Sequence, residues 1–126
     1  FGHGLSYTEF GYSNLQAGSK TISEGDSLSV SVDIANTGEV AGDEVVQLYV
    51  RYPESEVERP LKDLRGFDRI HIEPGETQTV TFNLKADDLR YWNPARNEWI
   101  LEQTPVELMI GASSEDIRKQ IIVEIK

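Results

Sequence analysis

Apolar and polar residues alternate with a period of two in several short runs, and this pattern constrains the fold most. The clearest run places Leu28, Val30, Val32 and Ile34 between polar residues. The alternation returns in four further runs, at 45–50, 80–84, 106–110 and 121–125. Successive side chains of a strand point to opposite faces of a sheet. The runs therefore predict strands that bury one face.

Turn signals separate these runs, and no long stretch has a helical period. Pro74 and Gly75 fit the two central positions of a type II turn, in which glycine supplies the positive φ. We predict an all-β chain, an antiparallel β-sandwich of about seven strands. That count includes a weak first strand near 10–15 and an irregular one within 64–72. Residues 86–89 are predicted to form one helical turn, and 53–63 a long exposed loop.

Composition excludes several classes of function. The 126 residues suffice for about one domain, and they carry a net charge of -10. This charge argues against binding to nucleic acid and to anionic membranes. The absence of cysteine excludes disulfides, thiolate metal sites and a cysteine nucleophile. No apolar run of ~20 residues and no signal peptide pattern occur, so we expect a soluble chain. Its start at Phe1 suggests a processed chain or a fragment.

Motif searches predict no catalytic, metal or cofactor site. The opening Gly2-x-Gly4 is an incomplete phosphate-loop motif, because no strand precedes it. His3 and His71 are far apart in sequence, which argues against a metal site. Adjacent carboxylates, as at 43–44 and 87–88, point in different directions and do not form an acid/base pair. No G-x-S-x-G nucleophile motif is present.

Two groups of apolar residues leave alternatives open. Tyr91, Trp92 and Trp99 bracket a turn, and either pack at one end of the core or in an interface, the preferred interpretation, or form a sugar-binding platform. In the run 44–52, Val45 and Tyr49 lie on the face opposite the core-facing residues. This strand is therefore central in its sheet, or something else covers its outer face.

Six stretches in the same order resemble one family, the family 3 glycoside hydrolases, which include β-glucosidases and β-xylosidases. They are FGHGLSYTEF, NTGEVAGDEVVQLYV, ERPLKDLRGFDRI, IEPGETQTVTFNL, LRYWNPARNEWIL and IGASSEDIR. The resemblance runs from Phe1 to about Arg118, which is nearly the whole chain. One departure lies at 102–105, where the family's E-P-G turn is replaced by EQTP.

The resemblance implies a C-terminal fibronectin type III-like domain that follows a barrel domain and an α/β domain. The family's catalytic aspartate and glutamate lie in those upstream domains, so no catalytic residue carries over to this chain. Residues 1–10 would form the inter-domain joint and 11–126 the sandwich. The expected function is that of a non-catalytic accessory domain that packs against and stabilises the catalytic domains. Alternatives are a carbohydrate-binding module with weak affinity for β-linked glycans and a free-standing interaction domain.

The resemblance also implies which residues contact the neighbouring domains. Arg59 and Lys62 would pair with acidic groups there, unless their loop is simply solvated. The full set of contact candidates is Phe1, Gly2, Gly4, Leu5, Tyr7, Phe10, Val45, Tyr49, Arg59 and Lys62.

Overall fold

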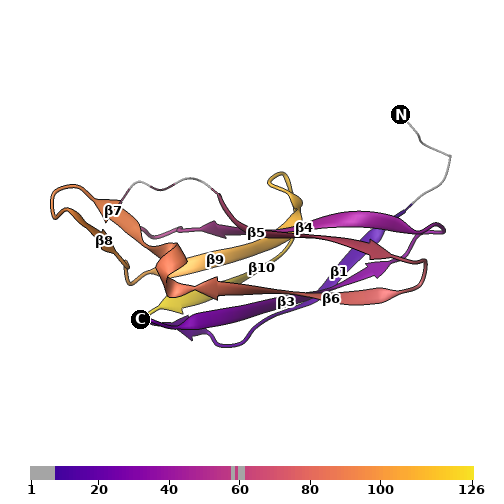
Figure 1. Ribbon diagram of the computed structural model, residues 1–126, viewed down its shortest axis with the longest axis horizontal. Coiled ribbons are helices and arrows are strands. Elements are labelled where there is room, and N and C mark those ends of the chain that lie inside the picture. Colours follow the sequence, from indigo (N-terminus) through magenta and orange to yellow (C-terminus); the bar gives the residue numbers. More distant parts are fainter. Residues whose placement is uncertain (1–7, 58, 60–61) are drawn as a thin grey trace.

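A computed structural model describes residues 8–57, 59 and 62–126, which form strands and one short 3-10 helix (Figure 1). The strands in chain order are β1 (Phe10–Ala17), β2 (Thr21–Ile22), β3 (Ser27–Asn36), β4 (Gly42–Arg51), β5 (Asp63–Ile72), β6 (Thr77–Lys85), β7 (Tyr91–Asn93), β8 (Glu98–Ile100), β9 (Pro105–Ser113) and β10 (Asp116–Ile125). The helix η1 (Ala86–Leu89) is the single helical turn expected from the sequence.

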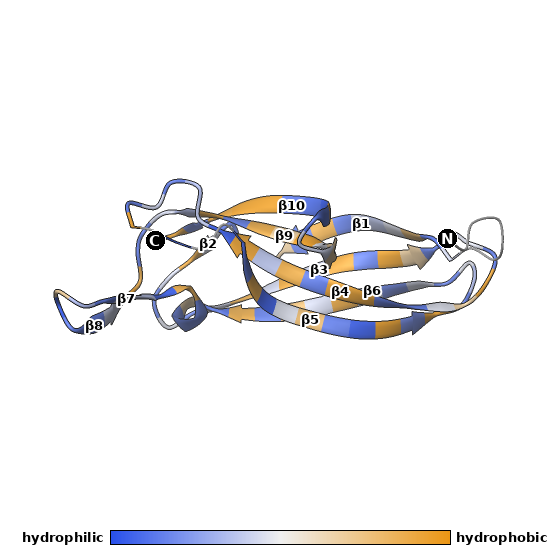
Figure 2. Cartoon of the chain, turned by 90° about the horizontal axis from the view of Figure 1, so that it is seen from above, coloured by the Kyte–Doolittle hydropathy of each residue, from blue (hydrophilic) through white to orange (hydrophobic). Residues whose placement is uncertain are grey.

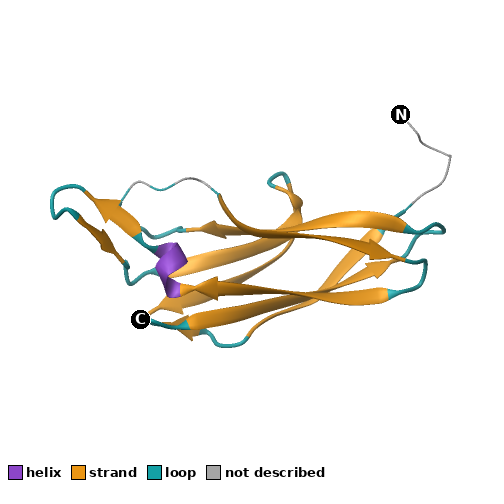
Figure 3. Cartoon of the chain, in the orientation of Figure 1, coloured by secondary structure: helices purple, strands orange, loops and turns teal. Residues whose placement is uncertain are grey.

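The strands form two packed sheets and one small hairpin. One sheet has the order β1-β3-β6, and the other has the order β2-β10-β9-β4-β5. Among the described residues, strands β7 and β8 pair only with each other, and they extend beyond one end of the sandwich, next to η1 (Figure 3). The prediction of an all-β sandwich is confirmed. The short parallel pairing of β2 with β10 is the exception to its antiparallel arrangement.

The core lies between the sheets and is built from the alternating apolar residues. In β3, Leu28, Val30, Val32 and Ile34 are all buried. Their counterparts in the facing sheet come from β4 and β9: Val46, Leu48, Val50, Val106, Leu108 and Ile110. Figure 2 shows the alternation of apolar and polar residues along the strands. The five alternating runs are therefore confirmed as strands, because each buries one of its two faces.

The turn at residues 73–76 carries the chain from β5 in one sheet to β6 in the other. Gly75 has φ of 78°, and the Glu76 amide donates to the Glu73 carbonyl at 3.0 Å. These features match a type II turn with proline and glycine at its centre. The turn predicted from the sequence is therefore confirmed.

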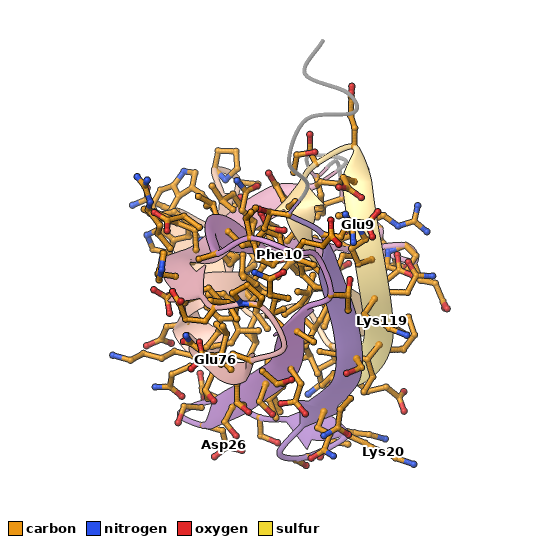
Figure 4. The ribbon with its side chains drawn as sticks, turned by 90° about the vertical axis from the view of Figure 1, so that its right-hand side faces the viewer. Glu9, Phe10, Lys20, Asp26, Glu76 and Lys119 are labelled. Carbon is orange, nitrogen blue, oxygen red and sulfur yellow. The ribbon has the colours of Figure 1, made fainter. Side chains whose placement is uncertain are left out.

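The structure differs from the sequence-based expectation at the start of the sandwich. Phe10 is the first residue of β1 and packs partly buried against the core, and Figure 4 labels it with Glu9 at this end of the molecule. The Glu9 carbonyl accepts a hydrogen bond from the Thr37 amide at 2.8 Å. Residues 9 and 10 thus belong to the sandwich. Five joint candidates lie outside the described residues: Phe1, Gly2, Gly4, Leu5 and Tyr7.

Candidate functional site

The outer face of the five-stranded sheet carries apolar residues where a solvated sheet has polar ones. In β4, Val46, Leu48 and Val50 point into the core, so Val45 and Tyr49 point outward. Tyr49 lies between Leu64 of β5 and Met109 of β9 in the strand register. A row of apolar side chains therefore crosses three neighbouring strands on this side of the sheet, where Leu64 is 47% exposed and Met109 only 3% exposed.

Two further large apolar residues extend this surface. Phe67 of β5 stands opposite Gln47 of β4 and has 68% of its area exposed. Ile122 of β10 stands opposite Glu107 of β9 and is 50% exposed. We call this surface the outer apolar face; its members are Val45, Tyr49, Leu64, Phe67, Met109 and Ile122. Exposed apolar clusters of this kind mark surfaces that another protein or domain covers.

Charged residues border the outer apolar face at one end of β4 and β5. Asp43 accepts from Arg69 at 3.0 Å, and His71 Nδ1 lies 2.6 Å from the same carboxylate. His71 Nε2 lies 2.7 Å from Glu73. The hydrogen bonds to Asp43 and then to Glu73 raise the pKa of His71 above its usual value. The protonated form, in which both ring nitrogens donate, is the one that satisfies both carboxylates.

A second candidate site is a cleft of about 460 Å³ at the end of the sandwich that carries the β7–β8 hairpin. Arg59 lines this cleft, and only 8% of its side chain is exposed. Its guanidinium carbon lies 3.9 Å from the centre of the Tyr52 ring and 4.8 Å from that of Tyr91. The cation is therefore held between two aromatic rings, an arrangement that stabilises a buried arginine. We call this space the arginine cleft.

Glu102 forms an ion pair with Arg59. Arg59 Nη2 lies 3.0 Å from Glu102 Oε1, and the same carboxylate accepts from Ser55 Oγ at 2.6 Å and from the Glu56 amide at 2.9 Å. Burial alone would raise the pKa of Glu102, but these hydrogen bonds and the arginine charge hold it below its usual value. Glu102 therefore stays ionised and fixes the loop that contains Arg59.

Further arginines line the same cleft, and each is already paired. Arg65 contacts Asp63, which also lines the cleft. Arg90 contacts Asp87 and Glu24, both at 2.9 Å. The cleft thus presents many hydrogen-bond donors, yet the carboxylates neutralise most of its positive charge.

The two tryptophans lie on the surface of the β7–β8 hairpin. Trp92 and Trp99 are directly opposite in the register and are 45% and 60% exposed. Their ring centres are 5.5 Å apart and their planes meet at 66°. The interpretation that they close the core is wrong, because the hairpin extends beyond the sandwich and leaves them outside it. Their packing in an interface stays a prediction. Tyr91 is turned toward Arg59 and lines the arginine cleft.

Comparison with known proteins identifies the family. The fibronectin type III-like domain family matches residues 44–114. The chain belongs to this family. It is 44% identical over 117 residues to thermostable β-glucosidase B of Acetivibrio thermocellus, an alignment that covers 93% of this chain and 16% of the relative.

Solved structures agree with this assignment of a fibronectin type III-like domain. A β-glucosidase from Erythrobacter marinus matches with a TM-score of 0.87 and 40% identity, over 100% of this chain and 16% of that one. A family 3 β-glucosidase of Bifidobacterium adolescentis matches with a TM-score of 0.85 and 30% identity, over 99% of this chain and 18% of that one. The chain thus spans under a fifth of each relative, and the resemblance stated from its motifs is confirmed.

The structure places the remaining predicted contact residues of the fibronectin type III-like domain in different surroundings. Val45 and Tyr49 lie on the outer apolar face. The Lys62 ammonium donates to the Ser114 carbonyl and lies beside Met109 of that face. Arg59 lies in the arginine cleft with Glu102 as its partner, so its side chain is not in an exposed loop. The inter-domain roles of these four residues stay predictions.

Sequence reasoning missed Phe67 and Leu64 of the outer apolar face, Tyr52 of the arginine cleft, and Glu102, which pairs with Arg59. The run 63–72 contains glycine and charged residues, so its alternation is hard to read. A bulge at the pairing of Leu48 and Tyr49 also shifts the register of β5. Glu102 lies 43 residues from Arg59, and no local signal joins them.

Within 8–57, 59 and 62–126, no group of three or more His, Cys, Asp or Glu side chains is placed to hold a metal ion. In the same part of the chain, no helix has the length and apolar character needed to cross a membrane.

Proposed function

We propose that this fibronectin type III-like domain is a non-catalytic accessory domain of a family 3 β-glucosidase, and that it docks on the catalytic part through its outer apolar face. The outer apolar face carries the proposal. Six apolar side chains on four adjacent strands face away from the domain's own core. A partner that covers the most exposed of them, Leu64, Phe67 and Ile122, removes apolar surface from water, which stabilises the assembly.

The partner that we propose is the rest of the β-glucosidase chain. The relatives are β-glucosidases, and the chain matches less than a fifth of their length. The remaining four fifths of such an enzyme is the segment that would cover the outer apolar face. Docking of this kind buries the face permanently, so the domain stabilises the catalytic part rather than acting on substrate itself.

The test is binding in trans. The β-glucosidase to which the chain would belong is produced without it, and the isolated domain is then added. We expect a stable complex and a higher melting temperature of the truncated enzyme. A domain carrying Phe67→Asp should bind markedly less, because the substitution places a charge on the outer apolar face. Absence of a complex, together with unchanged stability of the truncated enzyme, would favour a free-standing interaction domain instead.

The tryptophan pair does not by itself support a glycan-binding platform. A platform for an extended sugar chain requires rings that share one flat surface, whereas Trp92 and Trp99 meet at 66°. Tyr91 is half-buried beneath Arg59 and is not on the same surface. The hairpin aromatics therefore do not provide the three-ring platform considered from the sequence.

A further inference from the structure

Strand β5 is the last strand of the five-stranded sheet and lies along one side of the sandwich (Figure 2). One of its edges pairs with β4, and no strand within residues 8–57, 59 and 62–126 pairs with the other. An open edge of this kind presents backbone N–H and C=O groups on which a strand of another chain can add. Leu64 and Phe67 of the same strand have exposed side chains, so an added strand would also gain apolar contacts.

Asp68 lies on the core side of this edge strand. It stands opposite Val46 of β4, whose side chain is fully buried in the core. Residues directly opposite each other in an antiparallel pair share one face of the sheet, so Asp68 points toward the core side, in one row with Gly66 and Ile70. Asp68 is nevertheless exposed, because β5 is the end strand of its sheet. A charge thus interrupts the row of residues that faces the core.

The position of Asp68 along the strand matters as well. An irregularity in the pairing of β4 with β5 lies between Gly66 and Leu64, and such bulges bend a strand and disturb its edge. From Gly66 to Ile72 the pairing is continuous. This regular stretch is the part of β5 on which another strand could add, and Asp68 lies within it.

We propose that Asp68 protects the open edge of β5 and prevents a second copy of this chain from adding to the sheet there. Two copies that pair their β5 strands in antiparallel orientation form a two-fold arrangement. In a pairing centred on Asp68 the two carboxylates stand directly opposite each other, which is destabilising. A shift by two residues places each carboxylate opposite Gly66 or Ile70 of the other copy, where burial of an unpaired charge is costly.

This inference goes beyond the docking proposal and does not rest on it. Asp68 lies on the core side of the sheet, whereas the outer apolar face lies on the opposite side. The experiment uses this chain alone and requires no catalytic part. Failure of docking therefore leaves the protection of the β5 edge intact, and loss of that protection leaves the docking proposal intact.

The test is sedimentation velocity of the native chain and of Asp68→Val at increasing concentration. Asp68→Val removes the charge and keeps a residue that favours strands, so it should self-associate at least about tenfold more strongly than the native chain. Asp68→Thr also lacks the charge and should behave in the same way, which keeps the test valid if Asp68→Val does not fold. Native strength of self-association in both variants, or in Asp68→Thr alone when Asp68→Val is unfolded, overturns the proposal.

Two controls separate a charge at this position from net charge and added apolar surface. Asp68→Lys keeps a charge on the edge and should self-associate no more than the native chain. Glu115→Val removes one negative charge and adds the same apolar side chain on the exposed turn between β9 and β10, and should also match the native chain. If either control associates as strongly as Asp68→Val, the charge of Asp68 does not protect the edge.

Hydrogen exchange shows which surface the copies use. Backbone amides of residues 66–72 in Asp68→Val should exchange more slowly as its concentration rises, because an added strand pairs with the open edge. Those of β6, at 77–85, should not change and serve as the internal reference. Association that leaves 66–72 unprotected uses another surface and contradicts the proposal. Protection of 66–72 in the native chain at high concentration also contradicts it, since the edge would then pair despite Asp68.

Discussion

At the scale of single residues, Arg59 shows most clearly what a sequence leaves undetermined. It lies in a stretch rich in glutamate and proline, which predicts a solvated loop. In the structure its guanidinium is stacked between Tyr52 and Tyr91 and paired with Glu102. These partners come from three separate segments of the chain. Only the folded chain brings them together, so no pattern local to Arg59 predicts its burial.

Substitution of Arg59 tests whether this pair holds the loop. Arg59→Ala leaves the Glu102 carboxylate half-buried without its cation, and it removes the contact with both rings. We expect the free energy of unfolding to fall by about 3 kcal/mol or more, measured by denaturant titration of the isolated chain. The control is Arg51→Ala, which breaks the more exposed pair with Glu107 and should cost about 1 kcal/mol or less. Equal losses in the two variants would show that Arg59 is only a surface charge.

His71 gives the domain a predicted pH dependence. Its contacts with Asp43 and Glu73 raise its pKa in the folded state above the unfolded value. A raised histidine pKa contributes stability that is fully present below the unfolded pKa and is lost as pH rises through the folded pKa. Stability measured from about pH 5 to 8 should therefore fall across this range more in the native sequence than in His71→Gln. Parallel curves for the two proteins, or a His71 resonance that titrates below its usual range, would contradict this account.

At the scale of elements, alternation identifies long strands well and short ones poorly. The run 28–34 was predicted and lies within β3, because its period extends over several pairs of residues. Strand β2 has two residues, and β7 and β8 have three each. Runs of that length contain no measurable period, so the sequence of 91–100 predicts only a turn between aromatics. Its hairpin depends on pairing between Trp92 and Trp99.

The β9–β10 hairpin depends on one glycine. A Cβ at Gly111 would stand 2.0 Å from the Asp116 carbonyl oxygen, inside the irregular pairing of these strands. Because a backbone atom cannot move aside as a flexible side chain does, Gly111→Ala should lower the free energy of unfolding by about 2 kcal/mol or more. Gly11→Ala is the matched control, since its Cβ would make only an ordinary contact at 3.8 Å with Thr37. A melting temperature equal to that of the control would show that the hairpin relaxes around the added methyl group.

At the scale of the whole molecule, the sandwich buries its own core but leaves the outer apolar face uncovered. Val45 and Tyr49 were recognised from the sequence because β4 is apolar on both faces. Phe67 and Ile122 were not recognised from the sequence. Their position on this face depends on how β5 and β10 align with their neighbouring strands. The sequence thus indicated that β4 is apolar on its outer face as well, and the register shows how far this apolar surface extends over the neighbouring strands.

The most direct test of the docking account is thermal unfolding of Phe67→Asp in two settings. In the isolated chain the exposed Phe67 contributes little, so its stability should change by about 0.5 kcal/mol or less. In the full-length β-glucosidase the same substitution should lower the melting temperature by several degrees, because it buries a charge in the docked interface. Thr81→Asp, on the exposed surface of the other sheet, should be neutral in both. If Phe67→Asp is also neutral in the full-length enzyme, the outer apolar face is not the docking surface.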